Sequence, residues 1–315
     1  TKTIRLNKGA NSIKLTYASP SRGDAQLRLF WSERPDKPLP HEPIRNNRLF
    51  HNSTALLTQA ILAEKGREIF LENRCMRCHT SEGEGIPEMA MSGPGFATIG
   101  DRRHSAWMAK WILDPKAHRP SARMPKMLHG ETAPADAQAI AAYLGSLHAP
   151  KKPAVKLLEA ANEAAEEMVR ALNCIGCHNL PGEPAAEGKL SLAHVNHKFP
   201  RGELAAFLRA PNAHFAWTRM PKFDLTQKEA SNIAQWLRDK ADERESTDHL
   251  ATEEDVKRGK MLVATIGCLN CHNHKQENKF KTLDLGALMP DKWMSGCLAD
   301  TPSGKSPHFG FKPQD

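Results

Sequence analysis

A five-residue pattern that combines two thiols and an imidazole occurs three times in this 315-residue chain. Two cysteines are separated by two residues, and a histidine follows the second cysteine directly; the copies are Cys75, Cys78 and His79, then Cys174, Cys177 and His178, then Cys268, Cys271 and His272. Thiols at this spacing lie on one face of a helical turn, where both can add to the vinyl groups of one porphyrin. The next residue can then offer its imidazole to the iron. The pattern predicts three covalently bound haem c groups.

Zinc half-sites and redox dithiols also contain two cysteines at this spacing. Zinc sites usually pair two such cysteine pairs within one small fold. Here the copies lie 99 and 94 residues apart, and each carries its histidine at the same place. The spacing therefore favours three haem modules over a zinc site or a dithiol.

Length and composition agree with modules built around a cofactor. The length allows two or three domains, and the three motifs select three. Aromatic residues make up 6% of the chain and the mean hydropathy is −0.56, which is thin for a self-sufficient core of this size. A buried porphyrin in each module would supply the missing apolar surface, so we expect the protein without haem to fold poorly.

The charge balance points to the kind of partner. A net charge of +8 and a pI near 9.1 favour acidic redox proteins. Nucleic acid is not expected, because no aromatic residues are interleaved with the basic ones. No apolar run approaches the length of a membrane span, and no signal peptide is evident at Thr1. We therefore interpret the sequence as a mature or trimmed product.

The first 50 residues differ from the rest of the chain. Alternating apolar residues separated by Gly, Asn and Pro predict three β-strands, at residues 3–6, 12–17 and 25–31. The last of these, ending in Leu29, Phe30 and Trp31 before a proline-rich exit, resembles the C-terminal strands of protective-antigen-like β-domains, which often bind sugars. Three strands with open edges are a poor independent unit, so we expect an upstream segment or a companion chain to complete the sheet.

The segments before the three motifs can be aligned as repeats. Helical periodicity precedes each motif. A small residue stands nine positions before each first cysteine and an apolar one five positions before it; these are Gly66, Ala165 and Gly259, and Phe70, Val169 and Val263. At this spacing the two share one helix face, where the small residue would allow another helix to cross closely.

The segments after the first two motifs also align. Trp111 matches Phe207, and Met124 matches Met220 within two Arg-Met-Pro-Lys loops, before a closing helix. This order resembles class I cytochrome c. The resemblance implies a mainly α fold of three tandem haem modules, the third incomplete or atypical, after a short β segment. The expected domains are 1–50, 54–150, 155–243 and 250–315.

The resemblance implies ligands for the first two irons. His79 and His178 would bind from the proximal side, with Met124 and Met220 on the opposite side. In the first repeat, Pro94 would hold the proximal histidine, His79, through its carbonyl. The second repeat has Lys-Leu-Ser-Leu at this place, with no proline. Arg123 and Arg219 would pair with haem propionates, with an exposed surface role as the alternative. Haem c attachment outside the cytoplasmic membrane implies a periplasmic or otherwise exported protein.

Other residues remain alternatives as sixth ligands. His118 and His214 precede the two methionines by six residues and could give bis-histidine irons, or could bind a propionate or a carbonyl. In the third repeat the expected methionine loop falls at 306–312, which contains no methionine. The candidates for the third iron are His308, an open position, Met289, Met294, His274 and Cys297. Cys297 aligns with Phe207, so it is also read as an inert buried thiol, a thiolate ligand or half of a disulfide.

These features predict an exported electron-transfer cytochrome that belongs to a larger protein or complex. An iron with two protein ligands has no place for substrate, so such haems accept and pass electrons. Two alternatives stay open. One is a peroxidase-like cytochrome with an exchangeable third haem, and the other is a redox module anchored to carbohydrate by the N-terminal segment.

Overall fold

A computed structural model describes residues 4–18, 21–22, 27–32, 42–81, 92–150, 161–184, 186–213, 215–242, 250–289, 295–301 and 306–311. The chain divides into two compact units, Thr1–Gly66 and Arg67–Asp315, here called the N-terminal and the C-terminal unit. The fold is mainly helical, with a few two-residue strands.

The N-terminal unit contains one small strand pair. Strands β1 (Phe30–Trp31) and β2 (Glu42–Pro43) are antiparallel, and the 3-10 turn η1 (Asn46–Arg48) follows. The predicted strands at 3–6 and 12–17 do not form within the described residues 4–18. Their alternating apolar side chains are exposed instead; these are Ile4, Leu6, Ile13, Leu15 and Tyr17. Without neighbouring strands to pair with, an alternating sequence gains too little to hold strand geometry.

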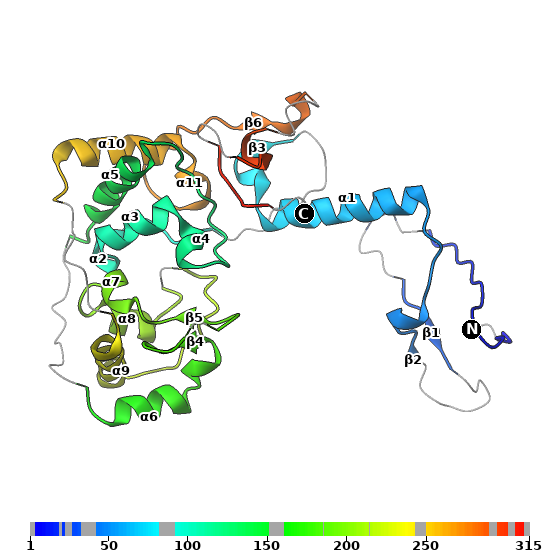
Figure 1. Cartoon of the computed structure of the whole chain (residues 1–315), viewed down its shortest axis with the longest axis horizontal. Coiled ribbons are helices and arrows are strands. Elements are labelled where there is room, and N and C mark those ends of the chain that lie inside the picture. Colours follow the sequence, from blue (N-terminus) through cyan, green and yellow to red (C-terminus); the bar gives the residue numbers. More distant parts are fainter. Residues whose placement is uncertain are drawn as a thin grey trace. The chain divides into compact units, whose positions relative to one another are not determined.

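Two helical bodies form the C-terminal unit (Figure 1). The one here called the split module comprises residues 92–150 and 250–280, and the continuous module comprises residues 161–242. The split module contains α2 (Ile99–Arg102), α3 (Ser105–Leu113), α4 (Pro115–His118), α5 (Ala133–Gly145), α10 (Glu253–Thr265) and α11 (Cys268–Cys271). The continuous module contains α6 (Ala164–Ala171), the 3-10 turn η3 (Cys174–Gly176), β4 (His178–Asn179), β5 (Leu190–Ser191), α7 (Val195–Lys198), α8 (Glu203–Arg209) and α9 (Gln227–Lys240).

The first motif lies apart from both modules along the sequence. It occupies the 3-10 turn η2 (Cys75–Arg77) and strand β3 (His79–Thr80). Strand β3 pairs in parallel with β6 (Leu283–Asp284), which leads into the turns η4 (Leu285–Ala287) and η6 (Gly296–Leu298). We call residues 75–81 and 283–301 the first-motif segment.

The core of the split module is the crossing of α5 and α10 (Figure 1). A Cβ added at Gly259 would lie 2.0 Å from the carbonyl oxygen of Ala139, so only glycine permits this approach. Val263 on α10 and Ile140 on α5 are almost fully buried beside it. The close crossing expected nine residues before a motif therefore forms in the third repeat, against a helix of the first repeat.

Helix α1 (Ala55–Glu72) precedes the first motif, and no residue along it is buried. A Cβ at Gly66 would meet no atom within 4 Å. Within the N-terminal unit, no close approach forms at this glycine, although Gly66 and Gly259 hold equivalent positions in the repeats.

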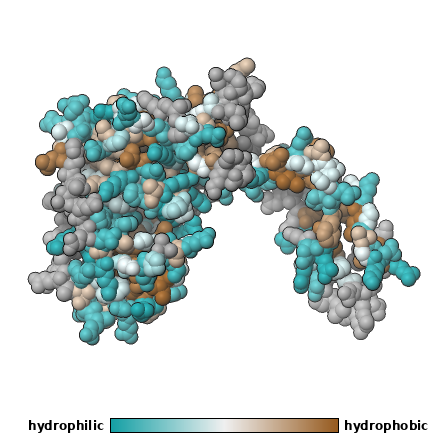
Figure 2. Space-filling view, viewed as in Figure 1, coloured by the Kyte–Doolittle hydropathy of each residue, from teal (hydrophilic) through white to brown (hydrophobic). Residues whose placement is uncertain are grey.

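The continuous module is built from neighbouring sequence. Ala165 and Val169 of α6 pack on Ala230 and Ile233 of α9, in one buried cluster. Helix α9 begins with a capping box in which Thr226 and Glu229 satisfy each other's backbone N–H groups. The coloured residues on the visible face of the C-terminal unit are mostly hydrophilic (Figure 2), as the low mean hydropathy requires.

Candidate haem-binding sites

The three motifs share one backbone signature. The residue directly before each first cysteine has a positive φ: 57° at Arg74, 52° at Asn173 and 96° at Gly267. Such a residue ends the preceding helix and reverses the chain. The cysteine pair then begins a new turn, a 3-10 turn in η2 and η3 and an α turn in α11.

Each motif histidine is oriented by a backbone carbonyl. The ring Nδ1 lies 3.2 Å from the oxygen of Leu283 at His79, 3.2 Å from that of Leu190 at His178, and 2.8 Å from that of Pro94 at His272. A protonated Nδ1 that donates to a carbonyl leaves the Nε2 lone pair available to a metal. Each of the three imidazoles therefore has an Nε2 lone pair that a metal can use.

Each supporting carbonyl belongs to a segment that pairs in parallel with the motif histidine. Leu283 pairs with His79 in β6 and β3, and Leu190 pairs with His178 in β5 and β4. An isolated parallel bridge joins Gly93 to His272. Leu190 fills the position that lacks proline in the second repeat, because a carbonyl acceptor can come from any residue.

Pro94 serves a different histidine from the one that the sequence suggested. The resemblance assigned it to His79, which precedes it in the same repeat, but its carbonyl contacts His272 of the third repeat. The α5–α10 crossing brings the third motif to this loop. A Cβ at Gly93 would lie 2.7 Å from the His272 ring, and Phe96 stacks on that ring with centroids 4.5 Å apart.

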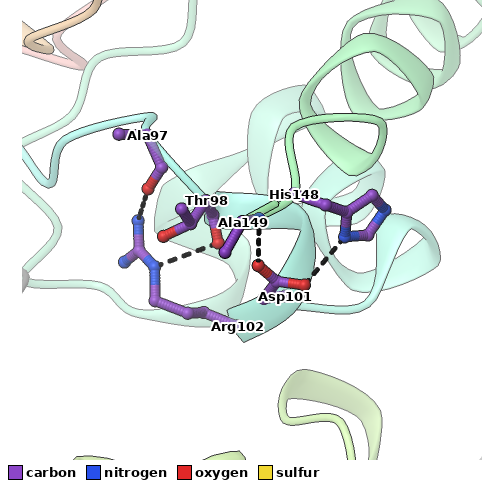
Figure 3. Close-up of polar contacts among 6 residues, drawn as sticks. All are labelled: Ala97, Thr98, Asp101, Arg102, His148 and Ala149. Carbon is purple, nitrogen blue, oxygen red and sulfur yellow. Dashed lines mark hydrogen bonds and ion pairs between the residues drawn. The ribbon is translucent and has the colours of Figure 1, made fainter. Parts of the chain in front are cut away.

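A buried arginine shapes the loop that holds His272. The Arg102 side chain is 5% exposed, and its Nη2 donates to the carbonyls of Gly95 (2.7 Å) and Ala97 (3.0 Å). Figure 3 shows the contacts of Arg102 with the carbonyls of Ala97 and Thr98. Sequence reasoning missed Arg102, because nothing in its local pattern separates a buried arginine from a solvated one.

The neighbouring Asp101 ties this loop to the end of α5. Its carboxylate accepts from the Ala149 backbone N–H at 2.8 Å and lies 2.9 Å from His148 Nδ1 (Figure 3). The turn carrying Pro94 is therefore anchored on both sides.

Burial shifts the pKa of several of the motif side chains. It raises the pKa of Cys75 to about 11, with Cys297 and Cys78 adding to the effect, and it raises the pKa of Cys268 to about 12. Burial also lowers the pKa of His178 and of His272. Neutral thiols and neutral imidazoles are the result, and a neutral imidazole is the form that binds a metal.

The first and third motifs touch. The Asn270 side-chain amide, inside the third motif, donates to Cys78 Sγ at 3.3 Å, and an Arg77 N–H donates to the Asn270 carbonyl at 3.3 Å. Cys297 lies in η6 of the first-motif segment, close enough to affect the pKa of Cys75. It is a free thiol there.

The proposed sixth ligands lie in different surroundings. Met220 is partly buried against the core of the continuous module. Met124 is partly buried between α4 and α5 of the split module. His308 runs beside the Met124 loop, where its N–H donates to the Lys126 carbonyl at 2.8 Å.

The remaining alternatives are less well placed. Met289 is 64% exposed, and His274 lies in the split module with its Nδ1 accepting from the Gln276 N–H at 3.3 Å. His118 is exposed, although partial desolvation still lowers its pKa. Met294 and His214 lie outside the described residues.

Cations gather where the two modules meet. The His104 N–H of the split module donates to the Lys198 carbonyl at 3.3 Å, and Arg103 lies over the Phe199 ring at 4.3 Å. Burial, then the charges of Arg103 and Arg119, lowers the pKa of Lys198 to about 7. We call Arg103, Arg119 and Lys198 the junction cations.

The arginines of both methionine loops approach the same place. Burial lowers the pKa of Arg119, and Arg219 and Arg123 lower it further. Arg123 and Arg219 are themselves exposed to solvent. The surroundings therefore fit a group that brings carboxylates, and haem carries two propionates.

The donor sets fit haem c. Each site offers two thiols and an imidazole whose Nδ1 is engaged, next to a packed apolar cluster in the split and continuous modules. In the described residues, no helix is long and apolar enough to cross a membrane.

Comparison with known proteins agrees with this chemistry. Residues 63–148 match the family model for cytochrome c. A stretch of 94 residues is 33% identical to part of cytochrome c oxidase subunit 2 from Alkalihalophilus pseudofirmus, covering 27% of this chain and 26% of that protein. The chain thus spans about a quarter of that relative's length. No solved structure matches the chain.

Proposed function

We propose that this chain, which contains a cytochrome c domain, carries three haem c groups and passes electrons between redox proteins outside the cytoplasm. The family match supports a c-type cytochrome with covalent haem. The count of three rests on the repeated motif geometry, and the location rests on the requirement that haem c is attached outside the cytoplasmic membrane.

The contact between Cys78 and Asn270 carries the proposal. Two attachment motifs that share a hydrogen bond would hold two porphyrins near each other, which supports electron transfer between them. The second motif is close as well, because burial lowers the pKa of His178 and the charges of Lys198 and of Arg119, which belongs to the split module, lower it further. All three motifs lie in one compact unit.

The protein's residues hold and tune the groups. When bound, haem c supplies a one-electron iron couple. His79, His178 and His272 are oriented through Nδ1 by carbonyls, and Arg102 fixes the turn behind His272. Burial of the sites and a thioether ligand both favour a comparatively high potential.

Axial pairs follow from which residues share a module. We assign Met220 to the iron of His178, since both belong to the continuous module. We assign Met124 to the iron of His272, because α5, α10 and the Pro94 turn hold both in the split module. This differs from the pairing with His79 that repeat order implied.

The junction cations suggest the partner. Arg103, Arg119 and Lys198, with Arg123 and Arg219 nearby, form a positive region that suits haem propionates and an acidic redox protein. Association with such a partner would weaken as salt is added.

A catalytic haem is the second candidate function, and it rests on the first-motif segment. Apart from the residues of the motif itself, the sulfur groups described there are Met289, which is 64% exposed, and Cys297. An iron at His79 without a firm sixth ligand could exchange small molecules, as in a peroxidase.

One set of measurements tests the proposal on the full haem-loaded protein. The intact mass should equal the polypeptide plus three porphyrins, and spectra should show thioether-ligated iron that is lost in part in Met220→Ala and in Met124→Ala. Carrier function predicts low-spin signals that cyanide leaves unchanged. A high-spin fraction that shifts with cyanide or peroxide supports catalysis, and a mass of fewer than three porphyrins contradicts the triheme assignment.

A further inference from the structure

We propose that His194, His197 and Asp242 form a binding site for a divalent transition-metal cation such as zinc, separate from the haem sites. One ligand atom from each residue lies within 4.8 Å of the others. The site is the one cluster of three such groups among the residues that the structure describes.

The two histidines are held on one turn. His194 caps the start of α7, and His197 follows three residues later, so both rings project from the same face. Their ring centroids are 6.0 Å apart with the planes nearly perpendicular. Two imidazoles are thus presented to one point without any backbone rearrangement.

The carboxylate is fixed opposite them. Asp242 follows α9, and its backbone N–H donates to the Ala193 carbonyl at 3.0 Å. The Asn196 side-chain amide donates to the Asp242 carbonyl at 3.2 Å and to the Arg238 carbonyl at 2.9 Å. Helix α7 also packs on α9. The ligand loop is therefore braced by hydrogen bonds that do not use the ligand atoms.

The separations suit a tetrahedral ion. With metal–ligand distances of about 2.0–2.1 Å, neighbouring ligand atoms of a tetrahedral zinc site lie roughly 3.3 Å apart. His194 Nδ1 and Asp242 Oδ2 are already 3.3 Å apart. A small rotation of His197 would complete three ligands and leave the fourth position to water.

Ligand chemistry selects the class of cation. Two imidazoles and one carboxylate suit zinc, copper or nickel, whereas calcium and magnesium prefer all-oxygen sites. The His194 and Asp242 side chains are 56% and 55% exposed, so an ion could enter directly from solvent.

The site lies beside functional groups. His194 comes four residues after Leu190, whose carbonyl orients His178. At the other end of α7, the Lys198 carbonyl accepts from His104 of the split module. A bound ion would tie α7 to the end of α9 and so stiffen the junction between the two modules.

The test uses the tag-free, haem-loaded protein and zinc alone. Equilibrium dialysis followed by elemental analysis should give one saturable zinc per chain, and His197→Ala should weaken binding at least tenfold. His148→Ala is the matched control, because His148 also contacts an aspartate, Asp101 at 2.9 Å, without a third ligand. Zinc-edge X-ray absorption should show two imidazoles in the wild type.

Several results would overturn the site. They are the absence of saturable zinc in the wild type, equal binding in His197→Ala and the wild type, and loss of binding in His148→Ala. If His197→Ala does not fold, zinc protection of His194 and His197 against diethyl pyrocarbonate in the wild-type protein decides instead. Unprotected rings at saturating zinc contradict the proposal. Haem content is measured separately, so failure of this site leaves the electron-transfer proposal untouched.

Discussion

The split and continuous modules have the same design but draw on the chain differently. In the continuous module the motif, its supporting strand and the closing helix α9 follow one another within residues 161–242. In the split module the motif and α10 come from 250–280, while the supporting turn and α5 come from 92–150. The same combination of motif, supporting carbonyl and packed helix therefore forms twice, once from neighbouring residues and once from segments far apart in the sequence.

Helices α1 and α10 show where the difference arises. Both precede a motif, and both carry a glycine nine residues before its first cysteine. Gly259 meets Ala139 at the α5 crossing, whereas Gly66 meets nothing within 4 Å. Local sequence thus determines where the helix and the motif form, and tertiary contacts determine which of these helices packs on α5.

The largest expected effect comes from removing single haems. Cys268→Ser with Cys271→Ser should unfold the split module, a loss of about 5 kcal/mol or more, which is the stability of a small domain. Cys75→Ser with Cys78→Ser should leave α5 intact. Hydrogen exchange of α5 peptides measures this, and loss of α5 protection only in the first-motif variant would contradict the split module.

The two glycines should respond with opposite signs. Gly259→Ala places a methyl group against the Ala139 carbonyl, so we expect destabilisation of about 2–3 kcal/mol. Gly66→Ala should stabilise helix α1 by about 0.5–1 kcal/mol, because alanine is the better helix former. Urea unfolding followed by circular dichroism checks both. Destabilisation by Gly66→Ala would mean that α1 makes the crossing.

A smaller effect is expected from the ion pair between α10 and α5. The guanidinium of Arg258 lies 2.5 Å from Asp136 Oδ1, and the Asp136 side chain is 14% exposed. A double-mutant cycle with Arg258→Ala and Asp136→Asn should give a coupling free energy of about 1 kcal/mol. A coupling energy near zero would show that these helices do not meet in solution.

A further effect is a change in the pH dependence of stability, which comes from the junction between modules. Burial lowers the pKa of Lys198 to about 7 from 10.5. Between these values the unfolded chain holds a proton that the folded protein has lost, so Lys198 makes stability rise as pH increases. Lys198→Met should flatten that slope, with Lys240→Met as the exposed control. An unchanged slope would mean that carboxylates, such as haem propionates, keep Lys198 charged.

Much of this architecture was predictable from local patterns. The motifs, the helices before them and the small residues at equivalent positions follow from spacing and periodicity, and the cytochrome c match at 63–148 agrees with the interpretation. Repeat order did not reveal that Pro94 supports His272, because pairing between distant segments depends on packing energy, not on a local signal.

Other features of the site lack a signal in the sequence. Arg102 is buried by the fold of its own turn, and Leu190 acts through a carbonyl that every residue has. The prediction of strands at 3–6 and 12–17 was wrong for a different reason. Alternation at 12–17 is a clear local signal, but a strand also needs a neighbouring strand to pair with. The count of three haems and the sixth ligands stay predictions.

The split module also has a consequence for biosynthesis. Helix α5 leaves the ribosome long before α10, with residues 146–252 made in between. Until α10 is made, the apolar face of α5 must be covered by other contacts. All residues of the continuous module are made during this interval. Maturation should therefore finish when the early helix α5 meets the late helix α10, and a nascent chain that stops before Glu253 would contain all of the continuous module but only part of the split module.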